Sequence, residues 1–252
     1  MDRFVAHWLG RAPYEPTRVL QEKLVTSRHS GTLGNTLLLL EHDPVITLGR
    51  RANAEHVLES REALARRGIE VCDTTRGGDV TFHGPGQLVA YPIFDLRPDR
   101  CDVRRYVRDL AAVMVRLAAR YGVEASFIDG ASNLIGVWVD RDSPQSWRGD
   151  PRTADGAKRP EKIGAIGVRI SRWITMHGFA FNVSTDLADF GRIVPCGIRG
   201  YGVTSLANLG HPAVRVEDAA RASVESFSEV FGVEGVVAGP EQTMALMQEH
   251  SS

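Results

Sequence analysis

Four segments of the chain repeat apolar residues at the spacing of an amphipathic helix. The strongest pattern covers residues 102–121, where one apolar stripe runs along the segment and Gly122 follows as a C-terminal cap. Shorter stripes of the same kind predict helices over residues 15–28 and 216–231. A more highly charged pattern predicts a further amphipathic helix over residues 54–67.

Short apolar runs bounded by turn residues predict strands between these helices. They cover residues 4–9, 35–41, 45–48, 69–72, 123–127, 133–139, 163–170 and 173–183. The last two runs are joined through Ser171 and Arg172, which predicts a hairpin. Because strands and helices do not alternate strictly, the pattern favours an α+β fold with mixed sheets over a doubly wound parallel sheet.

The same pattern suggests how the chain is organised into domains. We expect a single domain over residues 1–235 and a short C-terminal tail over residues 236–252. Residues 140–161 are rich in charge, proline and glycine and contain few apolar residues, which predicts a mobile surface loop. Such a loop is either a tolerated insertion or a lid or docking loop, and its position directly before Lys162 suggests the second reading.

Composition narrows the class of protein. Of the 252 residues, 43% are hydrophobic and 24% are charged, and the formal net charge of -1 indicates no nucleic-acid footprint. The three cysteines, Cys72, Cys101 and Cys196, are too widely spaced to indicate a disulfide framework or a zinc site. No apolar run is long enough for a signal peptide or a membrane span. We therefore expect a cytoplasmic protein with no metal, no nucleic-acid partner and no membrane partner.

A glycine-rich stretch over residues 76–86 is the first candidate for chemistry. Paired glycines after Arg76 let the backbone approach a ligand and present its N–H groups. The spacing fits neither a dinucleotide fingerprint nor a Walker A loop, which needs a following Lys-Ser or Lys-Thr. The ordinary alternative is a tight β-turn, with Arg76 as a surface charge and His83 as a turn histidine.

The second candidate is a cysteine with a possible activating lysine. Cys196 lies between Pro195 and Gly197, a sharp turn that would present the sulfur. A nucleophilic cysteine must be a thiolate, and a nearby cation that lowers its pKa by about 1.5 units contributes roughly 2 kcal/mol to that state. Lys162, at the start of a predicted strand, is the candidate cation. The ordinary alternative is a solvated lysine, because sequence alone does not bring the two residues together.

Taken together, four motifs resemble one enzyme family. The stretches RGGDVTFHGPGQLVAYPIFDL, KIGAIGVRI, HGFAFNV and PCGI occur in the order found in the lipoyl(octanoyl) transferases, and the resemblance covers roughly residues 4–231. It implies the fold of the biotin and lipoate protein ligases, with a larger and a smaller mixed sheet. It also implies transfer of octanoyl from octanoyl-acyl carrier protein to a lysine of lipoyl domains, namely those of 2-oxoacid dehydrogenases and the glycine cleavage H protein.

The resemblance assigns roles to individual residues. It implies that Cys196 is the acyl-thioester nucleophile and that Lys162 lowers the pKa of its thiol. It implies no cofactor, and we expect a monomer. The long segment over residues 140–161 departs from the family pattern and leaves open how a partner protein docks there. The substrate-binding residues that the resemblance implies are Arg76, Gly77, Gly78, Asp79, Val80, Thr81, Phe82, His83, Ala165, Ile166, Gly167, Gly178, Phe179 and Ala180.

Apolar members of this set are the expected walls of a slot for the acyl tail. Val80, Phe82, Ile166 and Phe179 are the candidates, although each is also compatible with a place in the core.

Three other functions are compatible with parts of the pattern. An ATP-dependent lipoate or biotin ligase would need the lysine but no nucleophilic cysteine, so the turn around Cys196 favours transfer. A cysteine hydrolase would need a histidine base, for which His83 and His177 are available. A binding module that has kept only the fold would need neither Cys196 nor Lys162.

Overall fold

The computed structural model describes residues 3–128, 134–147, 149, 156–194 and 201–250. Within these ranges the strands form a nine-stranded mixed sheet and a separate three-stranded sheet. The large sheet contains β1 (Arg3–Ala12), β2 (Asn35–His42), β6 (Gln87–Ile93), β7 (Ala125–Phe127), β8 (Val137–Asp140), β9 (Pro160–Ser171), β10 (Ile174–Asn182), β11 (Gly202–Val203) and β12 (Glu234–Val237). The small sheet contains β3 (Val45–Leu48), β4 (Glu70–Asp73) and β5 (Val80–His83).

The order of strands puts the hairpin of β9 and β10 in the middle of the large sheet. The order is β12-β1-β2-β6-β10-β9-β8-β7, with β11 pairing in parallel with β9 outside this path. β12, β1 and β2 run parallel, whereas β2, β6, β10, β9, β8 and β7 pair antiparallel in turn. The small sheet has the order β4-β3-β5. The predicted α+β class with a larger and a smaller mixed sheet is therefore confirmed.

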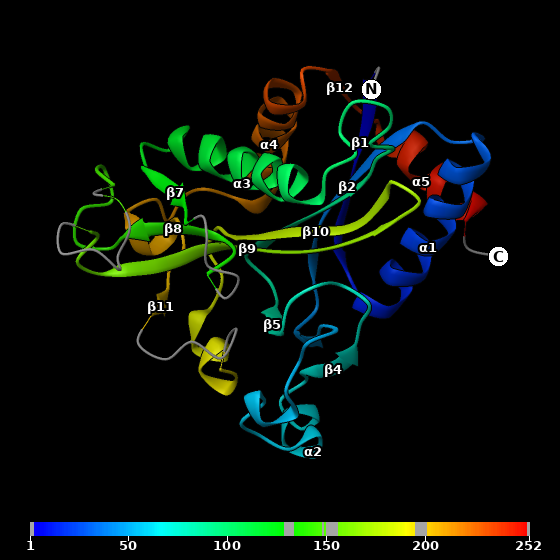
Figure 1. Cartoon of the computed structure of the whole chain (residues 1–252). Coiled ribbons are helices and arrows are strands. Elements are labelled where there is room, and N and C mark those ends of the chain that lie inside the picture. Colours follow the sequence, from blue (N-terminus) through cyan, green and yellow to red (C-terminus); the bar gives the residue numbers. More distant parts are fainter. Residues whose placement is uncertain (1–2, 129–133, 148, 150–155, 195–200, 251–252) are drawn as a thin grey trace.

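Helices cover both faces of the large sheet. They are α1 (Tyr14–Ser30), α2 (Arg61–Ala65), α3 (Val103–Ala119), α4 (Val216–Phe231) and α5 (Pro240–Glu249), with 3₁₀ turns at Ala54–His56, Leu187–Arg192 and Ala207–Leu209. In Figure 1, α3 and α4 lie above the sheet, α1 and α5 lie beside its N-terminal strands, and the small sheet with α2 lies below.

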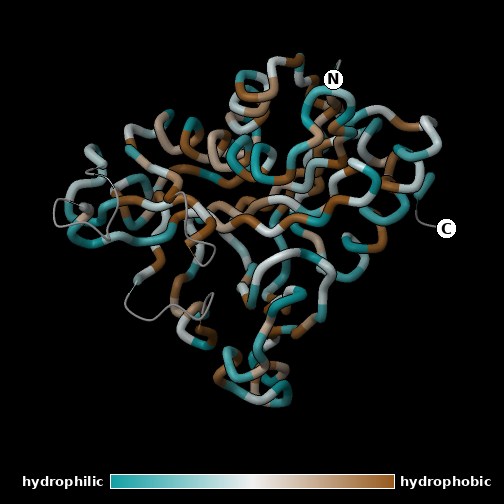
Figure 2. The backbone as a smooth tube through the Cα atoms, in the orientation of Figure 1, coloured by the Kyte–Doolittle hydropathy of each residue, from teal (hydrophilic) through white to brown (hydrophobic). Residues whose placement is uncertain are grey.

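Alternation along β2 explains why the sheet is covered on both sides. Leu37 and Leu39 belong to the core under α3 and α4, whereas Leu38 and Leu40 belong to the core under α1. Because successive side chains of a strand point to opposite faces, a continuous leucine run needs a layer on each face. Figure 2 shows the resulting concentration of hydrophobic residues in the central strands and on the helices that face them.

The strongest sequence patterns gave correct elements. The helix predicted over residues 216–231 is α4, and the stripe over residues 102–121 is α3, whose N-terminus is capped by the Asp102 side chain. The predicted hairpin is β9 and β10, but its turn lies at Arg172 and Trp173, one residue later than predicted, because Ser171 pairs with Ile174. The two turn residues have φ of 50° and 66°. Positive φ at both positions suits the tight turns that match the twist of paired strands.

The helix predicted over residues 54–67 is wrong. The structure has a 3₁₀ turn at Ala54–His56 and only the short α2 in this range. Val57 is extended and forms an antiparallel bridge with Ile193, and Ser60 starts α2 by accepting a hydrogen bond from the Ala63 N–H. Tertiary pairing and a new N-cap therefore divide a segment whose charge pattern is helical.

The segment predicted as a tail contains regular structure. β12 pairs in parallel with β1, and Leu246 of α5 is buried in the core under α1. Short elements of this kind give little periodic signal, because most of their residues are exposed. That one domain covers the residues before this segment stays a prediction.

Pairing also extends into both ends of the predicted loop over residues 140–161. Asp140 belongs to β8 and pairs with Pro160 of β9. The buried Asp140 carboxylate accepts hydrogen bonds from the backbone N–H groups of Asp142, Lys158 and Arg159, which ties the two strand ends together. Residues 148 and 150–155 lie outside the described residues.

Candidate active site

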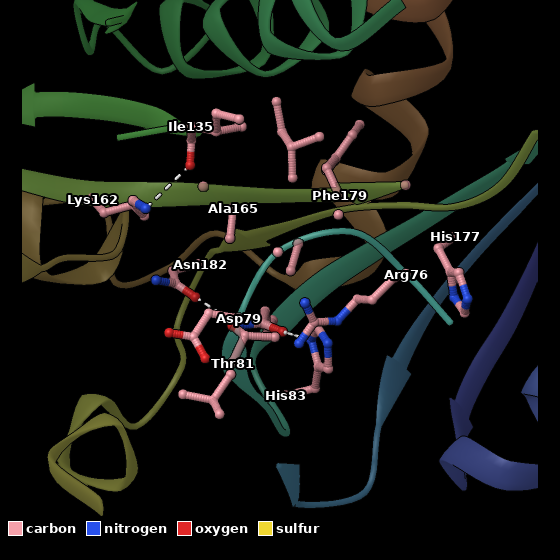
Figure 3. A pocket seen from close by; sticks show the side chains of 18 of the residues that line it. Arg76, Asp79, Thr81, His83, Ile135, Lys162, Ala165, His177, Phe179 and Asn182 are labelled. Atoms are coloured by element: carbon pink, nitrogen blue, oxygen red, sulfur yellow. Dashed lines mark hydrogen bonds between the residues drawn. The ribbon is translucent and has the colours of Figure 1, made fainter. Parts of the chain in front are cut away.

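A pocket opens between the central hairpin of the large sheet and the strand β5 of the small sheet (Figure 3). The glycine-rich stretch before β5, the start of α1, strand β6 and the residues Ile135, Phe190 and Val203 complete its walls. The residues that line it are Tyr14, Arg76, Gly78, Asp79, Val80, Thr81, His83, Gln87, Tyr91, Ile135, Lys162, Gly164, Ala165, Ile166, Gly167, His177, Gly178, Phe179, Ala180, Asn182, Phe190 and Val203.

This pocket brings together the three stretches that the sequence singled out, and Lys162 with them. Two of the predicted binding residues do not line it. Phe82 is 2% exposed and packs against Phe190 with 5.6 Å between ring centroids, so its place is the core of the small sheet. The Gly77 N–H donates to the Val168 carbonyl at 2.9 Å, which fixes the glycine-rich stretch to β9. The binding roles of the other residues stay predictions.

Lys162 lies in the pocket wall with its side chain almost buried. Only 8% of the residue is exposed, so Lys162 is not the solvated lysine of the ordinary alternative. Its Nζ donates to the Ile135 carbonyl at 3.1 Å and lies 4.7 Å from the centroid of the Trp138 ring. Both contacts favour a positive charge, because a carbonyl dipole and an aromatic face attract a cation.

A β-bulge sets the direction of this lysine. Trp138 of β8 pairs with Lys162, but the preceding Val137 pairs with Gly164, so β9 carries one extra residue. A bulge shifts the alternation of side chains along a strand. Ala165 and Gly167 consequently share the pocket side with Lys162, whereas a Cβ on Gly164 would meet the Met114 side chain of α3.

Cys196 lies outside the described residues, but the chain on either side of it reaches the pocket. On the N-terminal side, Phe190 lines the pocket and the Val194 N–H donates to the His56 carbonyl at 2.8 Å. On the C-terminal side, Tyr201 stacks edge-on against Trp138, with 5.4 Å between ring centroids. Val203 pairs with Lys162 through β11.

The glycine-rich stretch is held by a buried arginine. Arg76 is 7% exposed and donates to both the carbonyl and the hydroxyl of Thr47, so it is not a surface charge. The backbone passes Gly49 so closely that a Cβ there would lie 2.4 Å from the Gly78 carbonyl oxygen. Asp79 lies 2.5 Å from the ring of His56, which supports the stretch from its other side.

A chain of polar side chains continues from β5 to β10. The His83 ring lies 2.7 Å from the amide oxygen of Gln87, and the Gln87 amide donates to the Asn182 side chain at 2.9 Å. Asn182 in turn donates to the Thr204 carbonyl. His83 is thus part of an ordered network rather than a simple turn residue.

Three buried histidines at or beside the pocket, His42, His83 and His177, are neutral. Burial, followed by the charge of neighbouring groups, lowers the pKa of His83 to about 3. Burial, followed by the Arg76 charge, lowers the pKa of His177 to about 3, and burial lowers the pKa of His42 to about 4. A base with so low a pKa holds a proton weakly, so these rings act at neutral pH as hydrogen-bonding groups.

These depressed pKa values predict that the protein loses stability in mild acid. Below the ordinary histidine pKa of about 6.5, the unfolded chain binds protons that His42, His83 and His177 refuse in the folded state. Stability is then fully present above about pH 6.5 and falls toward pH 4. With about 1.4 kcal/mol per pH unit for each ring, we expect the free energy of unfolding to be about 4 kcal/mol lower at pH 5.5 than at pH 8.

Urea unfolding measured at half-unit pH steps checks this dependence. A His42→Gln variant should lose about a third of it, because one of the three rings no longer titrates. A free energy of unfolding that stays constant between pH 8 and pH 5.5 would contradict the buried neutral state of these histidines.

Sequence reasoning missed several residues of the pocket. The predicted binding set left out Tyr14, Tyr91, Ile135 and Asn182, all of which line the pocket. Tyr91 and Asn182 lie within two of the motifs, whereas Tyr14 and Ile135 lie in none. The backbone of His177 is a structural sign of a functional site. Its φ of 59° is uncommon for a residue other than glycine and occurs at constrained sites.

The structure also bears on metal and membrane binding. Within the described ranges, no cluster of three or more His, Cys, Asp or Glu side chains could hold a metal ion. None of the helices in these ranges has the length and apolar content that crossing a bilayer requires.

Comparison with known proteins identifies relatives across most of the chain. Residues 13–228 match the family model of the lipoyl protein ligase A/B catalytic domain. An octanoyltransferase of Myxococcus xanthus is 45% identical over 95% of this chain, which spans 63% of that relative's length. Octanoyltransferases of Acidobacterium capsulatum and Caldicellulosiruptor bescii are 46% and 40% identical, over 89% and 96% of this chain and 88% and 97% of their own lengths.

Solved structures share the fold at low sequence identity. A bipartite lipoate protein ligase from Thermoplasma acidophilum superimposes with a TM-score of 0.70 at 16% identity, over 100% of this chain and 92% of its own. A lipoate-protein ligase A bound with ATP gives a TM-score of 0.67 at 16% identity, over 100% and 94% of the two chains. These neighbours confirm the predicted lipoate-ligase type of fold.

Proposed function

The chain belongs to the family of the lipoyl protein ligase A/B catalytic domain and is an acyltransferase, and we propose that it transfers octanoyl from octanoyl-acyl carrier protein to a lysine of a lipoyl domain. The acceptors we propose are the lipoyl domains of 2-oxoacid dehydrogenases and the glycine cleavage H protein. The observation that carries the proposal is the nearly buried Lys162, whose strand pairs with Val203 just beyond Cys196.

In the first half-reaction, the Cys196 thiolate attacks the thioester carbonyl of the donor. A new carbon–sulfur bond forms to Cys196 and the bond to the carrier's sulfur breaks. The carrier thiolate leaves and takes up the proton that the Lys162 ammonium group gives up, so that Lys162 becomes a neutral amine. One thioester replaces another, so this exchange needs no ATP. Lys162 supports the step by favouring the thiolate of Cys196 over the thiol, as a cation beside a cysteine does.

In the second half-reaction, the acceptor lysine attacks the Cys196 thioester. An amide bond forms, the carbon–sulfur bond breaks, and Cys196 leaves as a thiolate. The attacking amine has an ordinary pKa of about 10.4 and must lose a proton during this step. We propose that Lys162 accepts it, because the acylated sulfur no longer provides the anion that stabilises the ammonium form.

The acyl tail would lie along the hairpin of β9 and β10. Val80, Ala165, Phe179 and Ala180 give this part of the pocket apolar walls, and Phe82 is no longer a candidate for them. An extended chain in such a slot excludes water from the thioester, which limits hydrolysis of the intermediate.

A larger side chain at position 165 tests this placement. Ala165→Phe should lower kcat/KM for octanoyl transfer by about 100-fold, because misplacing a reacting group by about 1 Å costs that much. Transfer of a butanoyl group, which is too short to reach the new ring, should suffer less. The control variant is Ala213→Phe, at an exposed position. If Ala165→Phe lowered kcat/KM equally for both acyl lengths, the assignment of the slot would be contradicted.

Two alternatives receive less support. The neutral His83 and His177, with pKa values of about 3, are weak bases for a cysteine hydrolase. A ligase remains the nearest rival because the fold neighbours are lipoate ligases.

Incubation with octanoyl-acyl carrier protein and a lipoyl domain, without nucleotide, separates transfer from ligation. We expect octanoylated lipoyl domain to form at full rate in the absence of ATP. Formation only with free octanoate and ATP would establish a ligase, and release of free octanoate without an acceptor would establish a hydrolase.

A further inference from the structure

The end of the pocket away from Lys162 is polar, although Val80, Ala165, Phe179 and Ala180 give the slot leading to it apolar walls. Figure 3 shows Arg76, His83 and His177 gathered at this end, across the slot from Lys162. Tyr14 and Tyr91 also line the pocket. A saturated acyl chain offers no hydrogen bond to such groups, so this end is unexpected for a pocket that only holds hydrocarbon.

Two of these groups have buried polar atoms that no described group satisfies. Tyr14 is 2% exposed and His177 is 1% exposed, yet Tyr14 Oη and His177 Nε2 have no hydrogen-bond partner among the described residues. The neighbouring Tyr91 hydroxyl, by contrast, lies 2.9 Å from the ring of His42. Buried polar atoms of this kind are normally paired with protein or with ordered water, which identifies the space in front of them as a site for water.

The register of the hairpin gives the distance from the reacting end to this polar end. His177 pairs with Val168, which lies six positions beyond Lys162 on β9. At about 3.3 Å per residue, with one residue taken up by the bulge, the separation is roughly 17 Å. An extended eight-carbon chain spans about 9 Å, given bonds of about 1.5 Å, and the thioester sulfur and the Lys162 side chain occupy much of the rest.

We propose that Tyr14 and His177 bind ordered water at the end of the pocket away from Lys162, and that this polar end, the polar floor, limits the length of the acyl chain. The inference rests on the proposed function, because it takes the apolar slot as the acyl site. A chain with two more carbons must displace water from Tyr14 Oη and His177 Nε2. Its methylene groups replace none of the lost hydrogen bonds, so the longer chain is selected against.

Calorimetric titration with free octanoate and decanoate measures how the polar floor affects affinity, without requiring any acyl transfer. The wild-type chain should bind octanoate more tightly than decanoate. Tyr14→Phe keeps the ring and removes the hydroxyl, so it should raise the affinity for decanoate relative to octanoate by about tenfold, equivalent to about 1.4 kcal/mol. Tyr106→Phe is the matched control, because Tyr106 is buried outside the pocket and its variant should keep the wild-type ratio.

A second variant covers the case in which Tyr14→Phe does not fold. His177→Asn removes the ring and suits the left-handed backbone at this position, so it should shift the ratio in the same direction. An unchanged ratio in the folded variants, or no binding of either acid by the wild type, overturns the polar floor. Failure of octanoyl transfer with acid binding intact would instead overturn the proposed function alone.

Discussion

Replacing Cys196 by alanine is expected to lower octanoyl transfer to the lipoyl domain by at least about 10³-fold, the order of loss seen when a covalent nucleophile is removed. In the mechanism that we propose, both half-reactions run through the Cys196 sulfur, so neither the acyl-enzyme nor the amide product should form at a useful rate. The measurement is single-turnover transfer from octanoyl-acyl carrier protein, followed by mass spectrometry of the lipoyl domain.

The other two cysteines are the natural controls. Burial and the neighbouring Glu70 raise the pKa of the Cys72 thiol to about 12, which leaves it protonated at neutral pH. The Cys101 thiol donates to the Leu96 carbonyl at 3.7 Å and does not line the pocket. Cys72→Ala and Cys101→Ala should therefore retain transfer. A Cys196→Ala variant that transfers octanoyl at a rate near that of the wild type would rule out the covalent route.

Lys162→Met should give the second largest effect, a loss of about 10²-fold or more in both half-reactions. Methionine keeps much of the length and the apolar stem that packs near Trp138. It removes the cation that we propose favours the thiolate and accepts the proton of the incoming amine. Rates of acylation and of deacylation, measured separately, check each part.

Thiol reactivity gives a readout that a structural defect would not mimic. In the wild type, alkylation of Cys196 should be rapid at neutral pH. In Lys162→Met it should require a pH near the ordinary cysteine value of about 8.5. Lys158 is exposed and lies just before β9, the strand that carries Lys162. Lys158→Met should therefore leave the pH profile of Cys196 alkylation unchanged. Identical alkylation profiles for wild type and Lys162→Met would exclude the activating role.

The sequence predicted the elements whose residues keep one period over their whole length. The stripe of α3 is of this kind, because it packs one continuous face on the core. The hairpin of β9 and β10 was predicted instead from two apolar runs joined by a short turn, and the bulge in β9 was not predicted. The helix prediction for residues 54–67 failed because Val57 pairs with Ile193, which is remote in sequence. The prediction missed the regular structure after residue 235, because β12 depends on pairing with β1 rather than on its own pattern.

The site could be predicted as far as motifs mark it. Glycine-rich and reactive positions such as Gly78, Ala165 and Lys162 do converge on one pocket. Sequence could not show that Phe82 packs into the small sheet, since an alternating strand allows either face. It could not find Tyr14 either, because only tertiary packing brings the start of α1 to the pocket.

The most direct measurement is mass spectrometry of the intact protein after mixing with octanoyl-acyl carrier protein in the absence of an acceptor. We predict one octanoyl group, located by peptide mapping on Cys196, which disappears when a lipoyl domain is added and reappears on its lysine. Transfer to the lipoyl domain with no octanoyl group ever detected on Cys196, or with the group on another residue, would contradict the account.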